Sequence, residues 1–180
     1  MRGVDYRITL TVGMLLLTAT AARAQTSVTL PNSSQTTTLT ANVSDQARVT
    51  VPAGVTFNVT NITANTAAGV ASLTVDNIVL ATATNQLKVS LQANAASFTP
   101  PVGGATTWSA SDVTWNAAAW TAATGASGTL SNAAFNTVGT CDADVSTCST
   151  AALVFTLAAK GTVKRSGNHT LVVTWKFESI

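Results

Sequence analysis

The chain is poor in the charged side chains on which most enzymes depend. Only 9% of its 180 residues are charged, its one histidine is His169, and its only glutamate is Glu178. A Ser-His-Asp triad needs a histidine oriented by a carboxylate, and glycoside hydrolysis needs two carboxylates flanking one bond. No spacing in the sequence indicates either arrangement. We therefore expect a protein that is not an enzyme, has no catalytic residues and needs no cofactor.

A metal-binding motif is also missing. The segment Asp142-Ala143-Asp144-Val145-Ser146 is similar to the first ligands of an EF-hand loop, which also needs Gly at its sixth position and Glu at its twelfth. Thr147 and Leu153 occupy those two positions. An EF-hand is thereby excluded. We predict no metal site and expect a solvated acidic loop, with a looser calcium site as the alternative.

Long hydrophobic runs are absent, and the one short run lies near the N-terminus. Arg2 and Arg7 precede or flank the apolar segment 8–18, and Ala22-Arg23-Ala24 supplies small residues at positions −3 and −1 of a cleavage site. The run is too short to span a bilayer core of about 30 Å as a helix. We predict that residues 1–24 are a cleaved signal peptide, that the protein is secreted to the cell surface or periplasm, and that it has no transmembrane segment.

Net charge disappears once residues 1–24 are removed. The nine Lys and Arg include three in that segment, and the seven Asp and Glu include one, so six of each sign remain. Nucleic-acid binding requires a basic surface, so we expect no nucleic-acid partner. A net charge near zero removes the repulsion that keeps copies apart, which favours self-association.

The sequence that remains is suited to extended backbone. It is rich in Thr and Val, which are β-branched, and apolar and polar residues alternate with a period of two in many segments. The alternation predicts strands at 36–43, 48–51, 55–59, 71–75, 78–80, 87–91, 153–157 and 171–178. The last two are expected to form a hairpin through the turn at 161–167. The Ala-rich segment 115–124 is expected to be a short helix or a loop across one end.

Turn residues separate these segments at intervals typical of all-β sandwiches. We predict an all-β fold: one antiparallel β-sandwich of Ig-like or jelly-roll type, formed by residues 25–180. Residues 25–39 are expected to form an extended N-terminal arm of this domain.

Two cysteines, Cys141 and Cys148, lie close together in the sequence. In an oxidising compartment such a pair is expected to form a disulfide. Because the loop that it closes is short, the expected stabilisation is modest. We predict that the bond fixes one hairpin loop.

Three tryptophans, Trp108, Trp115 and Trp120, lie within 13 residues and are flanked by Ser, Thr and Asn. They are candidates for an aromatic platform that binds a sugar ring. The alternative, which we favour, is that Trp115 packs in the core beside Val113 and another tryptophan caps one end of the sandwich, because tryptophan buries a large apolar area.

The C-terminal segment 171–180, LVVTWKFESI, contains Trp175-Lys176-Phe177. A chain with such an ending resembles uncharacterised secreted bacterial β-sandwich surface proteins. It is distantly similar to the WxL cell-wall-binding domain, whose terminal strand carries Trp-x-Leu; Phe replaces Leu here, and Trp108-Ser109-Ala110 is a more divergent second copy. The resemblance implies binding to the cell wall. In composition the chain also resembles a pilus or coat subunit.

Two functions follow as hypotheses. The first is a non-enzymatic surface protein that assembles into a filament or coat with copies of itself or other surface proteins. Its Thr-rich segment 25–39, with Thr26, Val28, Leu30 and Leu39, would add a strand to the sheet edge of a neighbour. The alternative is a module that binds cell-wall peptidoglycan or extracellular polysaccharide through the tryptophans.

Overall fold

The computed structural model describes residues 27, 29–31 and 35–180. The predicted signal peptide, with Thr26 and Val28 of the predicted strand-addition segment, lies outside the described residues. The chain divides into two compact units, Met1–Ala41 and Asn42–Ile180. Leu30 and Leu39 of the first unit are exposed. Among the described residues, no helix is long and apolar enough to cross a membrane.

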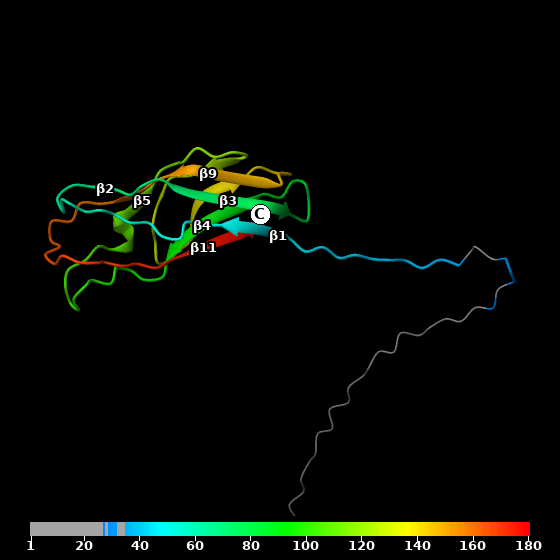
Figure 1. Ribbon diagram of the computed structural model, residues 1–180, viewed down its shortest axis with the longest axis horizontal. Coiled ribbons are helices and arrows are strands. Elements are labelled where there is room, and N and C mark those ends of the chain that lie inside the picture. The colour runs from blue at the N-terminus through cyan, green and yellow to red at the C-terminus, as the bar shows by residue number, and fades with distance from the viewer. Residues whose placement is uncertain (1–26, 28, 32–34) are drawn as a thin grey trace, which may run out of the picture. The chain divides into compact units, whose positions relative to one another are not determined.

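The second unit, which we call the body, is built from antiparallel strands (Figure 1). The prediction of an all-β chain is confirmed. Its elements are β1 (Gln46–Thr50), β2 (Thr66–Ala67), β3 (Ala71–Val79), β4 (Leu87–Ala93), the 3₁₀ helix η1 (Ala110–Asp112), β5 (Val113–Trp115), β6 (Ala123–Gly125), β7 (Gly128–Thr129), β8 (Asn136–Cys141), β9 (Thr147–Leu153), β10 (Phe155–Leu157) and β11 (Val173–Ser179).

These strands form three sheets. The first has the order β1-β3-β9, the second β2-β10-β5-β7 and the third β11-β4-β8-β6. The first and third sheets share a core to which β3 contributes Leu73 and Val75 and β4 contributes Leu87 and Val89. In each strand these two buried residues are separated by a residue that points to the opposite face of the sheet, as the sequence predicted. Shared burial between antiparallel sheets is what a β-sandwich requires.

The second sheet contributes to the other core cluster, together with residues of the first and third sheets. After Leu153 the chain leaves the first sheet, and Phe155 begins β10, which pairs with β2 and β5. Leu153, Phe155 and Leu157 are all buried, so the predicted alternation is confirmed although it is divided between two sheets. Together with Trp115 and Val138 they belong to one apolar cluster.

The two long sides of the body differ. On one side, Thr121, in the loop before β6, and Ser149 on β9 exchange backbone hydrogen bonds of 2.8 and 3.2 Å. These bonds join the first sheet to the chain that leads into the third. Ala126, which follows β6, donates to the Val138 carbonyl of β8 over 2.9 Å. β1 and β11 are terminal strands of the first and third sheets, and each pairs with one neighbour. The outer edge of each strand is therefore unpaired within the described chain.

Three predictions about local structure are wrong. Segments 36–43 and 55–59 contain no strand, although their residues alternate as predicted. The last two predicted strands do not form a hairpin, because β10 lies in the second sheet and β11 pairs with β4 in the third. A period of two shows only that a segment can be a strand; hydrogen bonding requires a partner, which the pattern does not specify. For segment 115–124, which was expected to be a short helix or a loop, the loop is confirmed: residues 116–122 connect β5 to β6 without a helix.

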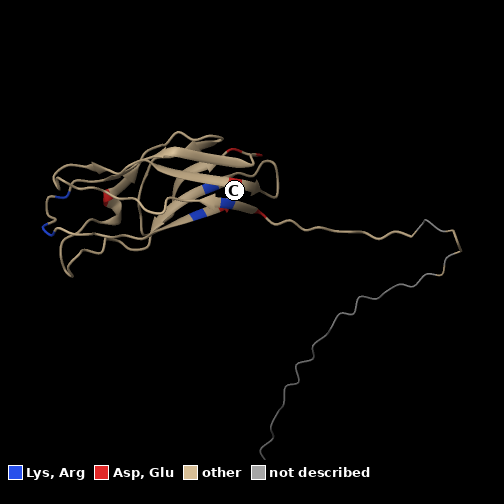
Figure 2. Ribbon diagram, in the orientation of Figure 1, with Lys and Arg blue, Asp and Glu red and all other residues tan. Residues whose placement is uncertain are grey.

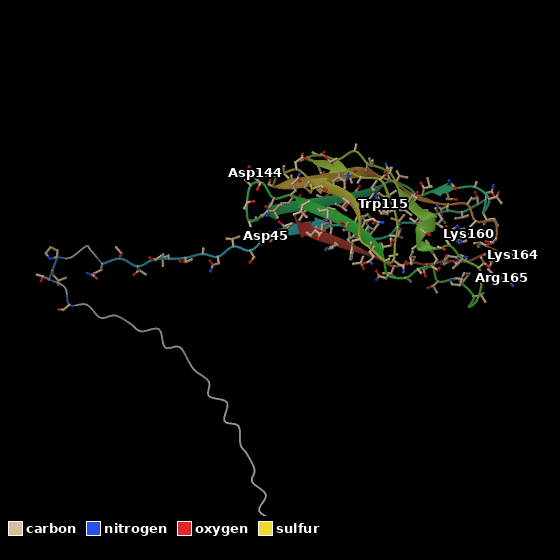
Figure 3. The ribbon with its side chains drawn as sticks, turned by 180° about the vertical axis from the view of Figure 1, so that it is seen from behind. Asp45, Trp115, Asp144, Lys160, Lys164 and Arg165 are labelled. Carbon is tan, nitrogen blue, oxygen red and sulfur yellow. A yellow bond between two sulfur atoms is a disulfide. The ribbon has the colours of Figure 1, made fainter. Side chains whose placement is uncertain are left out.

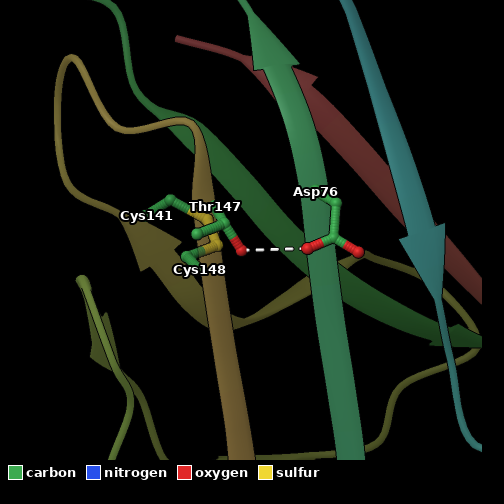
Figure 4. The surroundings of a disulfide bond; sticks show 4 residues. All are labelled: Asp76, Cys141, Thr147 and Cys148. Carbon is green, nitrogen blue, oxygen red and sulfur yellow. Dashed lines mark hydrogen bonds between the residues drawn. A yellow bond between two sulfur atoms is a disulfide. The ribbon is translucent and has the colours of Figure 1, made fainter.

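A disulfide joins Cys141 and Cys148, as predicted, with 5.8 Å between the Cα atoms (Figure 4). The prediction that it fixes a hairpin loop is wrong. Cys141 ends β8 in the third sheet, and Cys148 lies on β9 in the first. Both are buried in the core that these sheets share. Next to the bond, the Thr147 hydroxyl donates to Asp76 over 3.0 Å. The disulfide therefore links the two sheets across the core.

Candidate binding cleft

A cleft of about 1540 Å³ opens on the body. Two long segments outside the regular strands line it: residues 51–60, which continue from β1, and residues 163–172, which lead into β11. The cleft therefore continues the open side of the sandwich. Its volume exceeds the roughly 300–1,000 Å³ of a typical small-molecule site, which favours an extended occupant over a compact one.

The lining is mostly apolar. Its floor is formed by core side chains that are 1–5% exposed: Leu91, Trp108, Val113, Leu130, Phe155 and Leu157. Phe57 and Val59 on one wall, and Leu171 and Trp175 on the other, are half-buried and pack against that core. Most of the accessible apolar surface therefore belongs to the walls. An apolar occupant would cover it.

The backbone of one wall is largely unpaired. Among the described residues, the backbone of residues 52–60 forms one backbone–backbone hydrogen bond, from the Val59 N–H to the Phe57 carbonyl over 3.1 Å. Exposed backbone N–H and C=O groups in an extended segment can pair with an added strand. The wall thus offers both apolar side chains and backbone hydrogen-bonding groups.

A small polar cluster lies at one end of the cleft. The Arg165 carbonyl accepts a hydrogen bond of 3.1 Å from His169 Nε2, so Nε2 carries a hydrogen. His169 Nδ1 is 2.7 Å from the Thr107 hydroxyl, and the imidazole meets Trp108 edge-on with 5.2 Å between ring centres. His169 is half-buried. It orients the 165–169 loop, and no carboxylate is recorded as its partner among the described residues.

Charged residues are sparse along the ribbon of the body (Figure 2). Lys164 and Arg165 line the cleft at one end of the body, near Lys160 (Figure 3). Asp45, which lies just before β1, is at the opposite end (Figure 3). On β11, Glu178 accepts from Lys88 and Lys176, outside the cleft.

An ion pair supports the base of the 163–172 wall. Lys160 Nζ is 2.8 Å from Asp112 Oδ2, which also accepts from the Ser109 backbone N–H over 2.7 Å. Partial burial raises the pKa of the Asp112 carboxyl, but the hydrogen bonds from Lys160 and Ser109 and the charge of Lys160 together lower it by more, so the net pKa lies below its ordinary value. The Lys160 backbone N–H also donates to Ile62 over 2.7 Å. This pair ties η1 to the chain that leads into the wall.

The lowered pKa of Asp112 predicts an acid dependence of stability. Because the folded carboxyl has a lower pKa than the unfolded one, its contribution is present above the unfolded pKa of about 4 and is lost as the pH falls through the folded pKa. We expect Asp112→Asn to unfold at lower urea than the parent at pH 7, and the difference to shrink below about pH 4. Urea titrations at pH 3, 5 and 7 measure this, with Asp142→Asn as the control; a difference that is constant with pH would contradict it.

The predicted tryptophan platform is not assembled on one exposed surface. Trp108 and Trp115 are buried, and their indole N–H groups donate to the carbonyls of Ala158 at 2.9 Å and Ala126 at 3.0 Å. Trp120 is half-buried and packs against both core clusters. A Cβ on Gly139 would lie 2.8 Å from the Trp120 ring, so only glycine allows this packing. The three rings occupy core positions, and only Trp108 lines the cleft.

The residues of the WxL-like motifs also face the core. Trp175 and Phe177 are half-buried and pack against the clusters, while Lys176 between them is exposed. Trp108 and Ala110 of the second copy are buried. Neither copy forms an exposed recognition motif.

The acidic loop 142–146 borders a separate pocket of about 200 Å³. Asp142 and Asp144 line it together with Ile78 and Val145. In the part of the chain that the structure describes, no group of three or more His, Cys, Asp or Glu side chains is placed to hold a metal ion.

Comparison of the chain with protein-family models, with curated proteins and with solved structures gives no match.

Sequence reasoning missed the cleft, because its walls come from segments about 110 residues apart in the chain. One signal was available. The segment 55–59 alternates like a strand, and its inward residues Phe57 and Val59 do face the core.

Proposed function

We propose that the chain is an exported, non-enzymatic structural protein of the cell surface that assembles with copies of itself by strand addition. Residues 1–24 direct export, and the body is a sandwich of Ig-like or jelly-roll type. Its partners are other copies or other surface proteins. The disulfide supports this location, because such bonds persist in oxidising compartments.

One observation carries the proposal: a segment with the pattern of a strand pairs with no strand among the described residues of its own chain. Leu39, Ala41 and Val43 alternate with Thr38, Thr40 and Asn42, as in a strand with one apolar face. Residues 35–45 are nevertheless neither helix nor strand, and Leu39 is 92% and Val43 70% exposed. Exposed apolar residues in this arrangement favour binding to another surface.

The body offers edges to which such a segment can add. The outer edges of β1 and β11 are unpaired within the described chain. Natural proteins commonly protect such edges with charges, prolines or bulges. β1 has a bulge near Ala47, and the β11 edge has Lys176 and Glu178. Most of either edge is free to pair, and the low charge of the chain does little to oppose association.

A polysaccharide- or peptidoglycan-binding module is the second candidate. The volume of the cleft and the presence of Trp175 in its lining favour it. The lining, however, is rich in Val, Leu and Phe rather than in the polar groups that meet sugar hydroxyls. We therefore rank it below assembly.

Deletion of residues 25–43 tests the proposal. We expect a chain that begins at Gln25 to form assemblies visible by negative-stain microscopy and sedimenting far above the monomer. The deleted form should be a monomer with an unchanged circular dichroism spectrum, because the body is a separate compact unit. Assembly of the deleted form to the same extent would refute strand addition.

Two matched variants separate the faces of the segment. Leu39→Ser with Val43→Ser removes the apolar face, and Thr38→Ser with Thr40→Ser changes the opposite face. We expect the first variant to lose assembly and the second to retain it. Equal behaviour of the two would show that the segment does not act as a strand.

A further inference from the structure

We propose that the cleft between residues 51–60 and 163–172 is the site that receives the segment 35–43 of a second copy. We call this segment the arm. The inference rests on the proposed function and specifies where the added strand lies.

The arm matches the cleft in length and in polarity. The arm has nine residues, or about 30 Å when extended, and the 51–60 wall has ten. No residue from Gln25 to Ser44 is charged, so the inserted segment would bring no ionic side chain into the mostly apolar cleft. The arm's apolar face, with Leu39 and Val43, would lie against the half-buried side chains of the walls.

Both parts are strand-like segments that lack a partner. Segments 36–43 and 55–59 have the alternation of strands and form none. In the wall, Phe57 and Val59 already face the core, while the backbone of residues 52–58 has few recorded partners among the described residues. Pairing of the arm beside this wall would supply the hydrogen bonds that both segments lack.

The connection of the arm favours a second copy over the arm's own cleft. β1 begins at Gln46 and runs towards Val51, where the cleft wall starts. The arm is therefore attached at the end of β1 that is farther from the cleft. To enter its own cleft, the arm would have to reverse direction at residues 44–45. Residues 39–43 would then lie beside the five residues of β1, and only residues 35–38 of the arm would extend into the cleft. A second copy has no such restriction.

Cross-linking between two different chains tests this assignment. One chain carries Leu39→Cys and the other carries Val55→Cys or Val173→Cys. Val55 is in the 51–60 wall, and Val173, at the start of β11 directly after the other wall, also lines the cleft. The matched control is Ala133→Cys, which is exposed and does not line the cleft. The chains are mixed at micromolar concentration under assembling conditions and oxidised. Docking raises the local thiol concentration to roughly millimolar, so we expect about a hundredfold more heterodimer at the wall positions than at the control.

Each other outcome overturns the inference in a distinct way. Assembly without preferential cross-links to the walls would refute the cleft as acceptor and leave strand addition in place. An intrachain bond in the Leu39→Cys/Val173→Cys double variant, without heterodimers, would show that the arm fills its own cleft. Protection of Val55→Cys and Val173→Cys from a thiol reagent by soluble glycan, but not by a peptide of residues 35–43, would assign the cleft to a polysaccharide. If deletion of residues 25–43 leaves assembly intact, the proposed function fails as well.

Discussion

Replacing Trp115 with alanine is expected to lower the free energy of unfolding by about 3–5 kcal/mol. The side chain is 3% exposed, its indole N–H donates to the Ala126 carbonyl at 3.0 Å, and its ring lies 6.3 Å from that of Phe155. The substitution leaves a cavity at the centre of the larger core cluster and an unpaired carbonyl. Urea unfolding followed by circular dichroism measures the change.

The matched control is Val102→Ala, at an exposed position in a turn, which should change the free energy of unfolding by no more than about 0.5 kcal/mol. If Trp115→Ala does not fold, Leu157→Ala removes a smaller side chain from the same cluster and should cost about 2–5 kcal/mol. A loss below about 1 kcal/mol for both core variants would contradict the burial described for this cluster.

Removing the disulfide is expected to destabilise the body by about 2.5 kcal/mol, from the loop-closure entropy of the unfolded chain. Cys141 and Cys148 are seven positions apart in the sequence and are almost fully buried between two sheets. The double variant Cys141→Ala/Cys148→Ala removes the link without leaving thiols. Urea unfolding of the oxidised parent and the variant gives the difference.

Reduction provides an independent check on the disulfide. The parent protein in excess dithiothreitol should unfold near the same urea concentration as the double variant, and reductant should not affect the variant. Unchanged stability of the double variant would show that the bond contributes nothing to the native fold. The assembly test is separate, because neither cysteine lines the cleft.

The strands that could be predicted from the sequence have one apolar face and a buried position. β3, β4 and β10 each carry two or more large apolar residues at alternate positions, and those residues are buried as expected. Hydrophobic periodicity is a local property and is therefore visible in one sequence. The disulfide could be predicted from the short spacing of the two cysteines and the expected oxidising compartment alone.

The pairing of the strands could not be predicted in the same way. β10 and β11 are neighbours along the chain, but they lie in different sheets, and the disulfide crosses between sheets. These arrangements depend on long-range contacts that alternation does not specify. The same limit applies to Trp108, whose role in the floor of the cleft depends on segments 51–60 and 163–172.

The polar contacts near the cleft could not be predicted from the sequence either. The Asp112–Lys160 pair joins residues 48 positions apart, and His169 is held by Thr107 and Arg165. No spacing rule connects these residues. Their positions follow from the fold once β5, β10 and the 163–172 wall are in place.

Hydrogen–deuterium exchange on assembled and monomeric protein tests strand addition most directly. If the arm of one copy completes the sheet of another, amides of residues 35–43 should exchange rapidly in the monomer and slowly in the assembly. Residues 51–60 and 163–172 should gain protection at the same time, while β4 stays protected in both states. Assemblies in which residues 35–43 exchange as fast as in the monomer would contradict the account.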